Sequence, residues 1–213
     1  MSTIPTATIS RLVLYLRTLE RLESTGVKTT SSDFLADEAQ STAFQVRKDL
    51  AYFGRFGTRG AGYTVPTLRR ELRRILGLTR VWSVVVIGMG RLGQAIIHDP
   101  HIGDYSFEFK GAFDVKPDVV GQTFGDLEVQ PMDALPRVVK EKGIDMALLC
   151  TPSPAAQDAT DDVVRSGIRG ILNFTPTVLN VPTEVHVERM DFLTGLQRLS
   201  FYILNPQLAE ELG

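Results

Sequence analysis

The segment Trp82–Gly93 constrains the fold of this chain more than any other. A run of β-branched apolar residues leads into Gly88-Met-Gly-Arg-Leu-Gly93, and an acid, Asp114, follows 21 residues after the last glycine. A strand, a G-x-G-x-x-G turn that opens a helix, and an acid ending the next strand form the dinucleotide-binding fingerprint. The pattern therefore predicts a Rossmann-type parallel sheet.

The three glycines of this fingerprint have separate expected roles. Gly88 permits a tight turn, Gly90 lets backbone N–H groups approach a pyrophosphate at the helix N-terminus, and Gly93 allows close packing of helix on strand. Asp114 would accept hydrogen bonds from ribose hydroxyls and repel a 2′-phosphate, which favours NAD(H), although Lys116 carries the charge that a 2′-phosphate would need. The other residues expected at this part of the cofactor are Met89, Arg91, Leu92 and Val115.

Residues 81–213 alternate between strand-like and helix-like segments, which predicts a doubly wound parallel sheet in an α/β domain. Ligands bind at the carboxyl ends of strands in such sheets. Thr151 and Pro152 follow the fourth expected strand, and Asn173 and Phe174 follow the fifth, so we expect these four residues at the cofactor. The expected strands are 83–87, 107–114, 145–150, 170–174 and 185–190, with a further short strand at 127–130, and the expected helices are 92–98, 134–142 and 154–166.

No motif points to metal or nucleophilic chemistry. The single cysteine, Cys150, excludes an internal disulfide and a cysteine-based metal site, and without a visible activating partner we interpret it as a buried structural residue. The three histidines, His98, His101 and His186, show neither triad nor metal-ligand spacing. The longest apolar run is far short of the roughly 20 residues that a membrane span needs, and no signal peptide is visible. We expect a cytoplasmic protein.

The charge of the chain is unevenly distributed. Residues 1–80 carry 13 Lys and Arg against 7 Asp and Glu, a net charge of +6, whereas residues 81–213 carry a net charge of −8. A basic first part joined to an acidic second part is typical of a nucleic-acid-binding module linked to another domain. We therefore expect two domains, 1–80 and 81–213.

The first domain has the pattern of a helix-turn-helix. A first amphipathic helix, with apolar residues at helical spacing from Ile9 to Leu22, should end at Gly26, and a short helix at 34–39 precedes a third helix at 42–53. The third helix would turn Val46, Leu50 and Phe53 inward. A polar and basic N-terminal half suits a recognition helix in the major groove, where Arg and Lys donate to guanine and Gln pairs with adenine. The residues expected mostly outward, or in the preceding turn, are Ser41, Thr42, Gln45, Arg47, Lys48 and Asp49.

A glycine-rich segment, 54–65, follows this helix and indicates a β-hairpin wing. Arg55 and Arg59 would lie near phosphates or the minor groove, with Gly60 and Tyr63 also at the DNA. Pro66 would open a fourth helix with an apolar face and four outward arginines, Arg69, Arg70, Arg73 and Arg74. The other interpretation of residues 1–80 is a small helical domain with solvated arginines.

The last helix, 191–204, is apolar on most sides. A helix that is apolar nearly all round must be buried. At this place in the chain, a second subunit is the natural partner for it.

Taken together, these motifs resemble the Rex family of redox-sensing transcriptional repressors of bacteria. The likeness extends from Ile9 to Pro206 and is carried by Thr42-Ala-Phe-Gln-Val-Arg-Lys-Asp-Leu50, Gly57-Thr-Arg-Gly-Ala-Gly-Tyr63, Gly88-Met-Gly-Arg-Leu-Gly93, Ile171-Leu-Asn-Phe174 and the helix from Asp191. The resemblance implies a homodimer of winged-helix and Rossmann domains with an exchanged terminal helix. It also implies a repressor that binds palindromic operator DNA and is released by NADH, with NADH and NAD⁺ as effectors.

The resemblance also implies roles for individual residues. Arg47 and Lys48 would contact the major groove, Arg59 would act in the wing, and Phe192 would lie near the nicotinamide. Arg17 and Asp191 would form a charge pair between the two domains. One position departs from the family pattern, since Asp99 stands where the family usually has a tyrosine.

Two other classes of protein have to be weighed against this one. An NAD-dependent oxidoreductase needs a proton donor beside the nicotinamide, and no Tyr-x-x-x-Lys motif or later substrate domain is visible. A regulator that senses another nucleotide or coenzyme A would share the fold. In a redox sensor the cofactor acts as effector, because an apolar pocket disfavours the cationic ring of NAD⁺ relative to neutral NADH.

Overall fold

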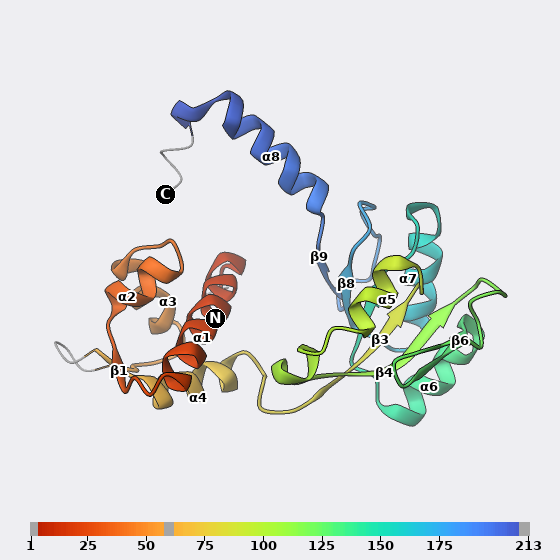
Figure 1. Ribbon diagram of the computed structural model, residues 1–213, viewed down its shortest axis with the longest axis horizontal. Coiled ribbons are helices and arrows are strands. Elements are labelled where there is room, and N and C mark those ends of the chain that lie inside the picture. The colour runs from red at the N-terminus through yellow and green to blue at the C-terminus, as the bar shows by residue number, and fades with distance from the viewer. Residues whose placement is uncertain (1–3, 58–61, 209–213) are drawn as a thin grey trace. The chain divides into compact units, whose positions relative to one another are not determined.

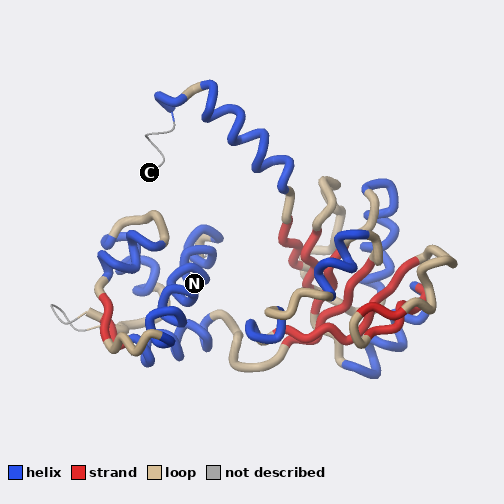
Figure 2. Tube along the Cα trace, in the orientation of Figure 1, coloured by secondary structure: helices blue, strands red, loops and turns tan. Residues whose placement is uncertain are grey.

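The computed structural model describes residues 4–57 and 62–208, which form two compact units, the second of which spans Val81–Pro206. Figure 1 labels the elements of both units, and Figure 2 separates helices from strands. The first unit is mainly helical with one small sheet, and the second is built on a seven-stranded sheet. Each unit has its own hydrophobic core.

The first unit contains the expected helix-turn-helix. Helix α2 spans Ser32–Glu38 and α3 spans Ala43–Ala51, between α1 at Thr6–Ser24 and α4 at Val65–Ile75. Two side chains fix where the short helices begin: Ser31 Oγ accepts from the backbone N–H of Phe34, and Thr42 Oγ1 accepts from that of Gln45, both at 3.1 Å. The core includes Leu12, Leu19, Leu35, Val46, Leu68 and Leu72, each 0% exposed.

The wing differs from the expected hairpin. Strand β2, Tyr63–Thr64, pairs antiparallel with β1, Thr29–Thr30, and the described residues 54–57 form no strand. Thr29 and Thr30, which precede helix α2, supply the strand partner. Gly62 has φ +72°, and a Cβ on it would lie 2.3 Å from the carbonyl oxygen of Thr30, so this close approach of the two backbones requires glycine.

The second unit is a doubly wound sheet of strand order β5-β6-β4-β3-β7-β8-β9, which confirms the expected fold class. All neighbouring strands are parallel except β5 and β6. The expected short strand at 127–130 is confirmed as β6, whereas β5 is too short to show a periodicity. The bounds are β3 Trp82–Ile87, β4 Phe107–Asp114, β5 Thr123–Phe124, β6 Leu127–Pro131, β7 Met146–Leu149, β8 Gly170–Asn173 and β9 His186–Arg189.

Three helices cover the two faces of this sheet (Figure 1). Alternate residues of β3 point to opposite faces, as in any strand. Val85 and Ile87 pack in a core with α6, Leu135–Lys142, and α7, Ala156–Arg165. Val86 belongs to a second core, where Ile97 of α5, Arg91–Ile97, packs. The strand order reverses beside β3, so the glycine turn that follows β3 lies at the switch point of the sheet.

Helix α8, Phe192–Leu204, follows β9 and begins at Asp191, whose carboxylate accepts from the backbone N–H groups of Leu193 and Thr194. No residue of this helix is buried. The expected burial of its apolar side chains therefore does not come from its own chain. Over residues 4–57 and 62–208, no helix combines the length and apolar character required to cross a bilayer.

Candidate dinucleotide cradle and nucleic-acid interface

The glycine turn after β3 leaves room for a side chain at only one of its three glycines. Gly88 has φ +94°, and a Cβ there would lie 2.9 Å from backbone atoms of Cys150 and Thr151. A Cβ on Gly93 would lie 2.3 Å from the carbonyl oxygen of Gly88. Gly90, at the N-cap of α5, has no atom within 4 Å of such a Cβ. Two glycines thus serve close packing, and the third leaves open space at the start of the helix.

Asp114 ties this turn to the end of β4. Its Oδ2 accepts from the backbone N–H of Met89 at 2.7 Å, and its Oδ1 accepts from the N–H groups of Val115 and Lys116 at 2.8 and 2.9 Å. A carboxylate offers about four lone-pair sites. The backbone occupies three of them, which leaves about one for a ribose hydroxyl.

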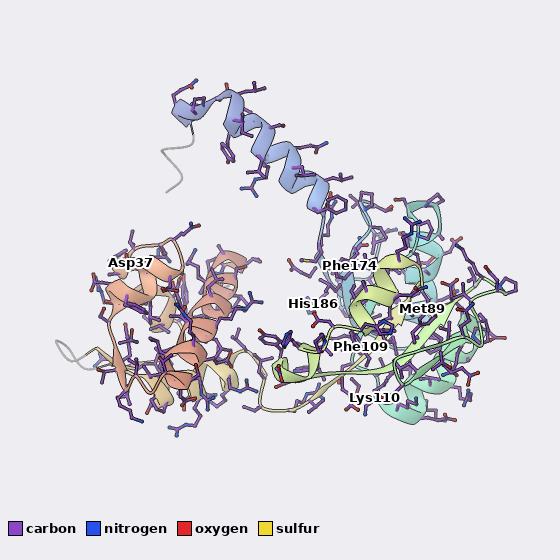
Figure 3. The ribbon with its side chains drawn as sticks, in the orientation of Figure 1. Asp37, Met89, Phe109, Lys110, Phe174 and His186 are labelled. Atoms are coloured by element: carbon purple, nitrogen blue, oxygen red, sulfur yellow. The ribbon has the colours of Figure 1, made fainter. Side chains whose placement is uncertain are left out.

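The other residues expected at the turn divide into buried and exposed ones. The side chain of Met89 is 1% exposed and belongs to the same core as Phe109 (Figure 3), while its N–H is bonded to Asp114. Met89 therefore shapes the turn and does not present its side chain to a ligand. The side chains that remain at the surface are those of Arg91, Leu92 and Val115.

The segments after β7 and β8 behave differently from each other. Thr151 Oγ1 is buried and has no hydrogen-bond partner among the described residues. An unpartnered buried hydroxyl is costly, by about 1–3 kcal/mol, so its place next to Gly88 suits a polar ligand atom. Asn173 is 0% exposed, and its amide bonds the backbone of Thr175 and Thr177, so it holds its own loop. Pro152 and Phe174 (Figure 3) directly follow these two residues.

Cys150 lies beside Gly88 and is half-buried. Burial raises the pKa of its thiol to about 12, so the thiol stays protonated near neutral pH. This agrees with a structural cysteine. Across the described parts of the chain, no group of His, Cys, Asp and Glu side chains is arranged to hold a metal ion.

Helix α3 presents a mixed polar face to solvent. Thr42, Arg47 and Lys48 are exposed as expected, and Arg47 Nη1 donates to Ser32 Oγ of α2 at 2.8 Å. Phe44, which no sequence motif singled out, is 68% exposed in the first turn of this helix. Phe44 lies two residues before the inward Val46, and residues at this spacing do not share a helix face. This spacing could have predicted that Phe44 points outward.

Asp49 does not face outward, and that expectation was wrong. The residue is 0% exposed and accepts hydrogen bonds from four side chains. Charge alone suggested a surface position, but Arg11 of α1 compensates the buried carboxylate. The donors to Asp49 are Arg11 Nε at 2.6 Å and Nη2 at 2.8 Å, Gln45 Nε2 at 2.8 Å, and Thr8 Oγ1 and Tyr15 OH at 3.0 Å.

This network changes the titration of its members. Burial opposes ionisation of Asp49, but the hydrogen bonds from Arg11, Gln45, Thr8 and Tyr15 outweigh it and lower the pKa of the carboxyl. Burial, together with the bond to Asp49, raises the pKa of Tyr15 to about 12. The carboxylate is therefore charged, and the phenol neutral, at physiological pH.

The stability contributed by Asp49 should depend on pH. Because the pKa is lowered on folding, the contribution is present above the ordinary value of 3.8 and is lost as the pH falls below it. Asp49→Asn should lower the free energy of unfolding by about 3 kcal/mol at neutral pH, since it leaves Arg11 without its partner. Calorimetry of both full-length chains from pH 7 to pH 3 should show the gap narrowing in acid; a gap independent of pH would contradict this.

Several basic and aromatic residues of the first unit are less exposed than expected. Arg69 and Arg73 of α4, expected outward, are half-buried and pair with Glu23 and Glu20 of α1 at 2.8 and 3.2 Å. Tyr63, expected at the DNA, is 8% exposed and lies in the core, because strand β2 pairs with β1. Among the other expected DNA contacts, Ser41 is half-buried, and Arg59 and Gly60 lie outside the described residues.

The expected charge pair between Arg17 and Asp191 joins residues of different units and stays a prediction. Asp191 caps α8, and hydrogen bonds from Thr194 and Leu193 lower the pKa of its carboxyl. Arg17 and Phe192 are both exposed, and Phe192 is the first residue of α8. Asp99 accepts from the backbone N–H of His101 at 2.9 Å.

A helix-turn-helix unit and a Rossmann unit with a dinucleotide cradle define a class, the DNA-binding regulators controlled by a nucleotide. A family model described as CoA binding domain matches residues 79–177, and one described as putative DNA-binding protein N-terminus matches residues 3–51. The redox-sensing transcriptional repressor Rex of Thermus thermophilus is 56% identical over 209 residues, which is 98% of each chain. This chain belongs to the Rex family of redox-sensing transcriptional repressors, as its motifs suggested.

Two solved structures of a protein called RSP resemble the whole chain. RSP in complex with β-NAD⁺ and operator DNA is 36% identical, with a TM-score of 0.91 over 100% of this chain and 98% of that one. RSP in complex with β-NADH is 35% identical, with a TM-score of 0.86 over 100% of each chain. The likeness therefore covers both units and is not confined to the Rossmann sheet.

Proposed function

We propose that this chain is a repressor that binds palindromic operator DNA when NADH is scarce and releases it when NADH binds. The observation that carries the proposal is the full-length likeness to a chain seen with both NAD⁺ and operator DNA. The cradle supports it, because the space at Gly90 and the unpartnered hydroxyl of Thr151 lie where a dinucleotide binds in a doubly wound sheet.

The cofactor acts as a signal in this proposal. Oxidised nicotinamide is cationic and the reduced ring is neutral, so a pocket that includes Phe174 and Phe192 binds NADH more tightly. A ligand that prefers the conformation with low DNA affinity weakens DNA binding. DNA must in turn weaken binding of the ligand by the same factor. No catalytic group is required, which agrees with relatives that are named as repressors.

Helix α8 supports a homodimer. Its large apolar side chains are exposed within their own chain, so a second copy of the chain would cover them. A two-fold dimer would place two recognition helices on the half-sites of a palindrome. With operator DNA as its partner, the protein would work in the cytoplasm. The exposed residues are Phe192, Leu193, Leu196, Leu199, Phe201, Ile203 and Leu204.

The DNA contacts proposed for α3 follow its exposed face. Arg47 and Lys48 supply charge and base contacts in the major groove, and Thr42 lies at the helix start beside them. The exposed ring of Phe44 adds an apolar contact of the kind that thymine methyl groups make. Arg59 and Gly60 would add the wing contact that the family resemblance implies.

A gel-shift titration tests the proposed function. Purified full-length protein is mixed with an operator selected from random DNA and titrated with NADH, NAD⁺ or coenzyme A. NADH should weaken operator binding by about 5–150-fold, the usual range of coupling between two sites, while coenzyme A should have no effect. Equal operator affinity with NADH and NAD⁺ would refute the redox response, and release by coenzyme A alone would assign another effector.

A further inference from the structure

A cavity of about 740 Å³ lies in the first unit, between the start of α2, helix α3 and residues 54–57. Ligand pockets begin at roughly 300 Å³, so a phosphodiester with its flanking sugars would fit in this volume. The described lining residues carry two cations and one acid, which leaves an excess of positive charge. The polar residues of the lining are Ser31, Ser32, Asp33, Arg47 and Arg55.

Arg47 connects the α3 side of the cavity to its α2 side. Its Nη1 donates to Ser32 Oγ at 2.8 Å, which directs the guanidinium toward α2. An arginine has five N–H donors, so about four of them stay available beside this bond. The hydroxyl of Ser32 accepts from Arg47 and still has its own hydrogen to donate. Both side chains can therefore donate hydrogen bonds to an anion in the cavity.

Arg55 supplies the second cation from the segment that follows α3. The residue is exposed, and within residues 4–57 and 62–208 it forms no ion pair that would compete with a ligand. Leu50, Phe56 and Tyr63 contribute apolar walls to the same cavity. An excess of positive charge beside apolar walls attracts an anion more strongly than the same charge on an open surface.

The place of the cavity on DNA follows from the proposed function, on which this inference rests. Helix α3 would read the major groove, and the wing after residues 54–57 would lie at the adjacent minor groove. One phosphate backbone separates two adjacent grooves, so that backbone must pass between α3 and the wing. The cavity lies on this side of α3, because residues 54–57 form one of its walls.

We propose that the cavity binds one phosphate of this backbone through Arg55, Arg47 and the hydroxyl of Ser32. The sequence left open whether Arg55 lies near phosphates or the minor groove, and the position of the cavity favours a phosphate. Contacts to phosphates fix the register of a protein on DNA but carry no sequence information directly. Arg55 therefore sets the affinity of α3 for DNA and its position in the groove, and does not read bases.

Neutral phosphates locate this contact. An operator is selected from random DNA with the full-length protein, and each phosphate in turn is replaced by an uncharged methylphosphonate. At one phosphate in each half-site the replacement should weaken the wild-type protein by about tenfold, as for loss of a hydrogen bond to a charged group, but Arg55→Gln by less than about twofold. If no phosphate shows this difference between the two proteins, the proposal is wrong.

Arg70→Gln is the matched control, because it removes the same charge from an exposed residue of α4 outside the cavity. Arg55→Gln should reduce the slope of log affinity against log salt by about 1 per subunit, and Arg70→Gln should leave it unchanged. The preference of Arg55→Gln for operator over random DNA should equal that of the wild-type protein. Equal loss of slope in both variants, or a changed preference in Arg55→Gln, would overturn the proposal.

Asp33 provides a test of opposite sign. Asp33→Asn removes the one acid among the described lining residues, so operator affinity should rise by about threefold, as expected for a charge several ångströms away in water. The rise should vanish on the operator with the neutral phosphate, and a rise that persists there would contradict the proposal. A protein that binds no operator would overturn the proposed function too. NADH-responsive operator binding without a phosphate coupled to Arg55 would overturn this inference alone.

Discussion

Gly93→Ala should abolish the response to NADH. A Cβ at this position would lie 2.3 Å from the carbonyl oxygen of Gly88, an atom of the backbone that cannot rotate away. Helix α5 must then move off β3, which displaces the turn that would receive the pyrophosphate. Overpacking of this kind typically lowers the free energy of unfolding by about 1–3 kcal/mol. NADH binding is followed by fluorescence titration, and unfolding by calorimetry.

Two further glycines provide the controls for this variant. Gly103 has no atom within 4 Å of an added Cβ and lies away from the turn, so Gly103→Ala should leave both stability and NADH affinity unchanged. Gly90→Ala should also fold normally, but its methyl group would occupy the space beside the helix start and weaken NADH binding. Normal NADH release of DNA by Gly93→Ala would show that the cradle is elsewhere.

Leu199→Asp should convert the protein to monomers and remove high-affinity operator binding. Leu196, Leu199 and Ile203 recur at helical spacing on α8 and are 56%, 58% and 76% exposed. A charge in this stripe would oppose burial against a second copy. Loss of two-site binding should lower operator affinity by about 10²–10⁴-fold. Analytical ultracentrifugation and gel shifts measure the two effects.

The control for this variant is Gln197→Asp. It adds the same charge to the same helix at an exposed polar position, so the dimer should persist. A dimeric Leu199→Asp that binds operator as tightly as the wild-type protein would place the dimer interface outside this stripe.

The second unit was predictable because its signals are local. The apolar run of β3, the spacing of the three glycines and the acid at Asp114 specify a turn whose geometry the structure reproduces. The hydrogen bonds of the Met89 backbone N–H and of the Asn173 side chain could not be predicted in the same way. Which backbone groups their atoms bond depends on loops that meet only in the folded sheet.

The first unit contains contacts between distant segments that sequence patterns do not predict. Ser31 and Thr42 cap helices α2 and α3, as serine and threonine commonly do at helix N-termini. The burial of Asp49 depends on Arg11, 38 residues earlier in the chain, and the pairing of β1 with β2 joins segments more than 30 residues apart. Charge alone predicts that Asp49 is exposed to solvent. Its burial can be predicted only if its partner Arg11 is known, and that pairing depends on how α1 packs on α3.

The buried carboxylate of Asp49 also limits how this protein could be redesigned. Recognition helices are often treated as exchangeable cassettes, to be grafted from one scaffold to another. A graft of α3 alone would transfer the Asp49 carboxylate without three of its hydrogen-bond donors. These donors, Thr8, Arg11 and Tyr15, belong to α1. A recipient without those side chains would bury that charge unpaired, at a cost of about 3–5 kcal/mol. A transplant of α3 should succeed only when the matching face of α1 travels with it.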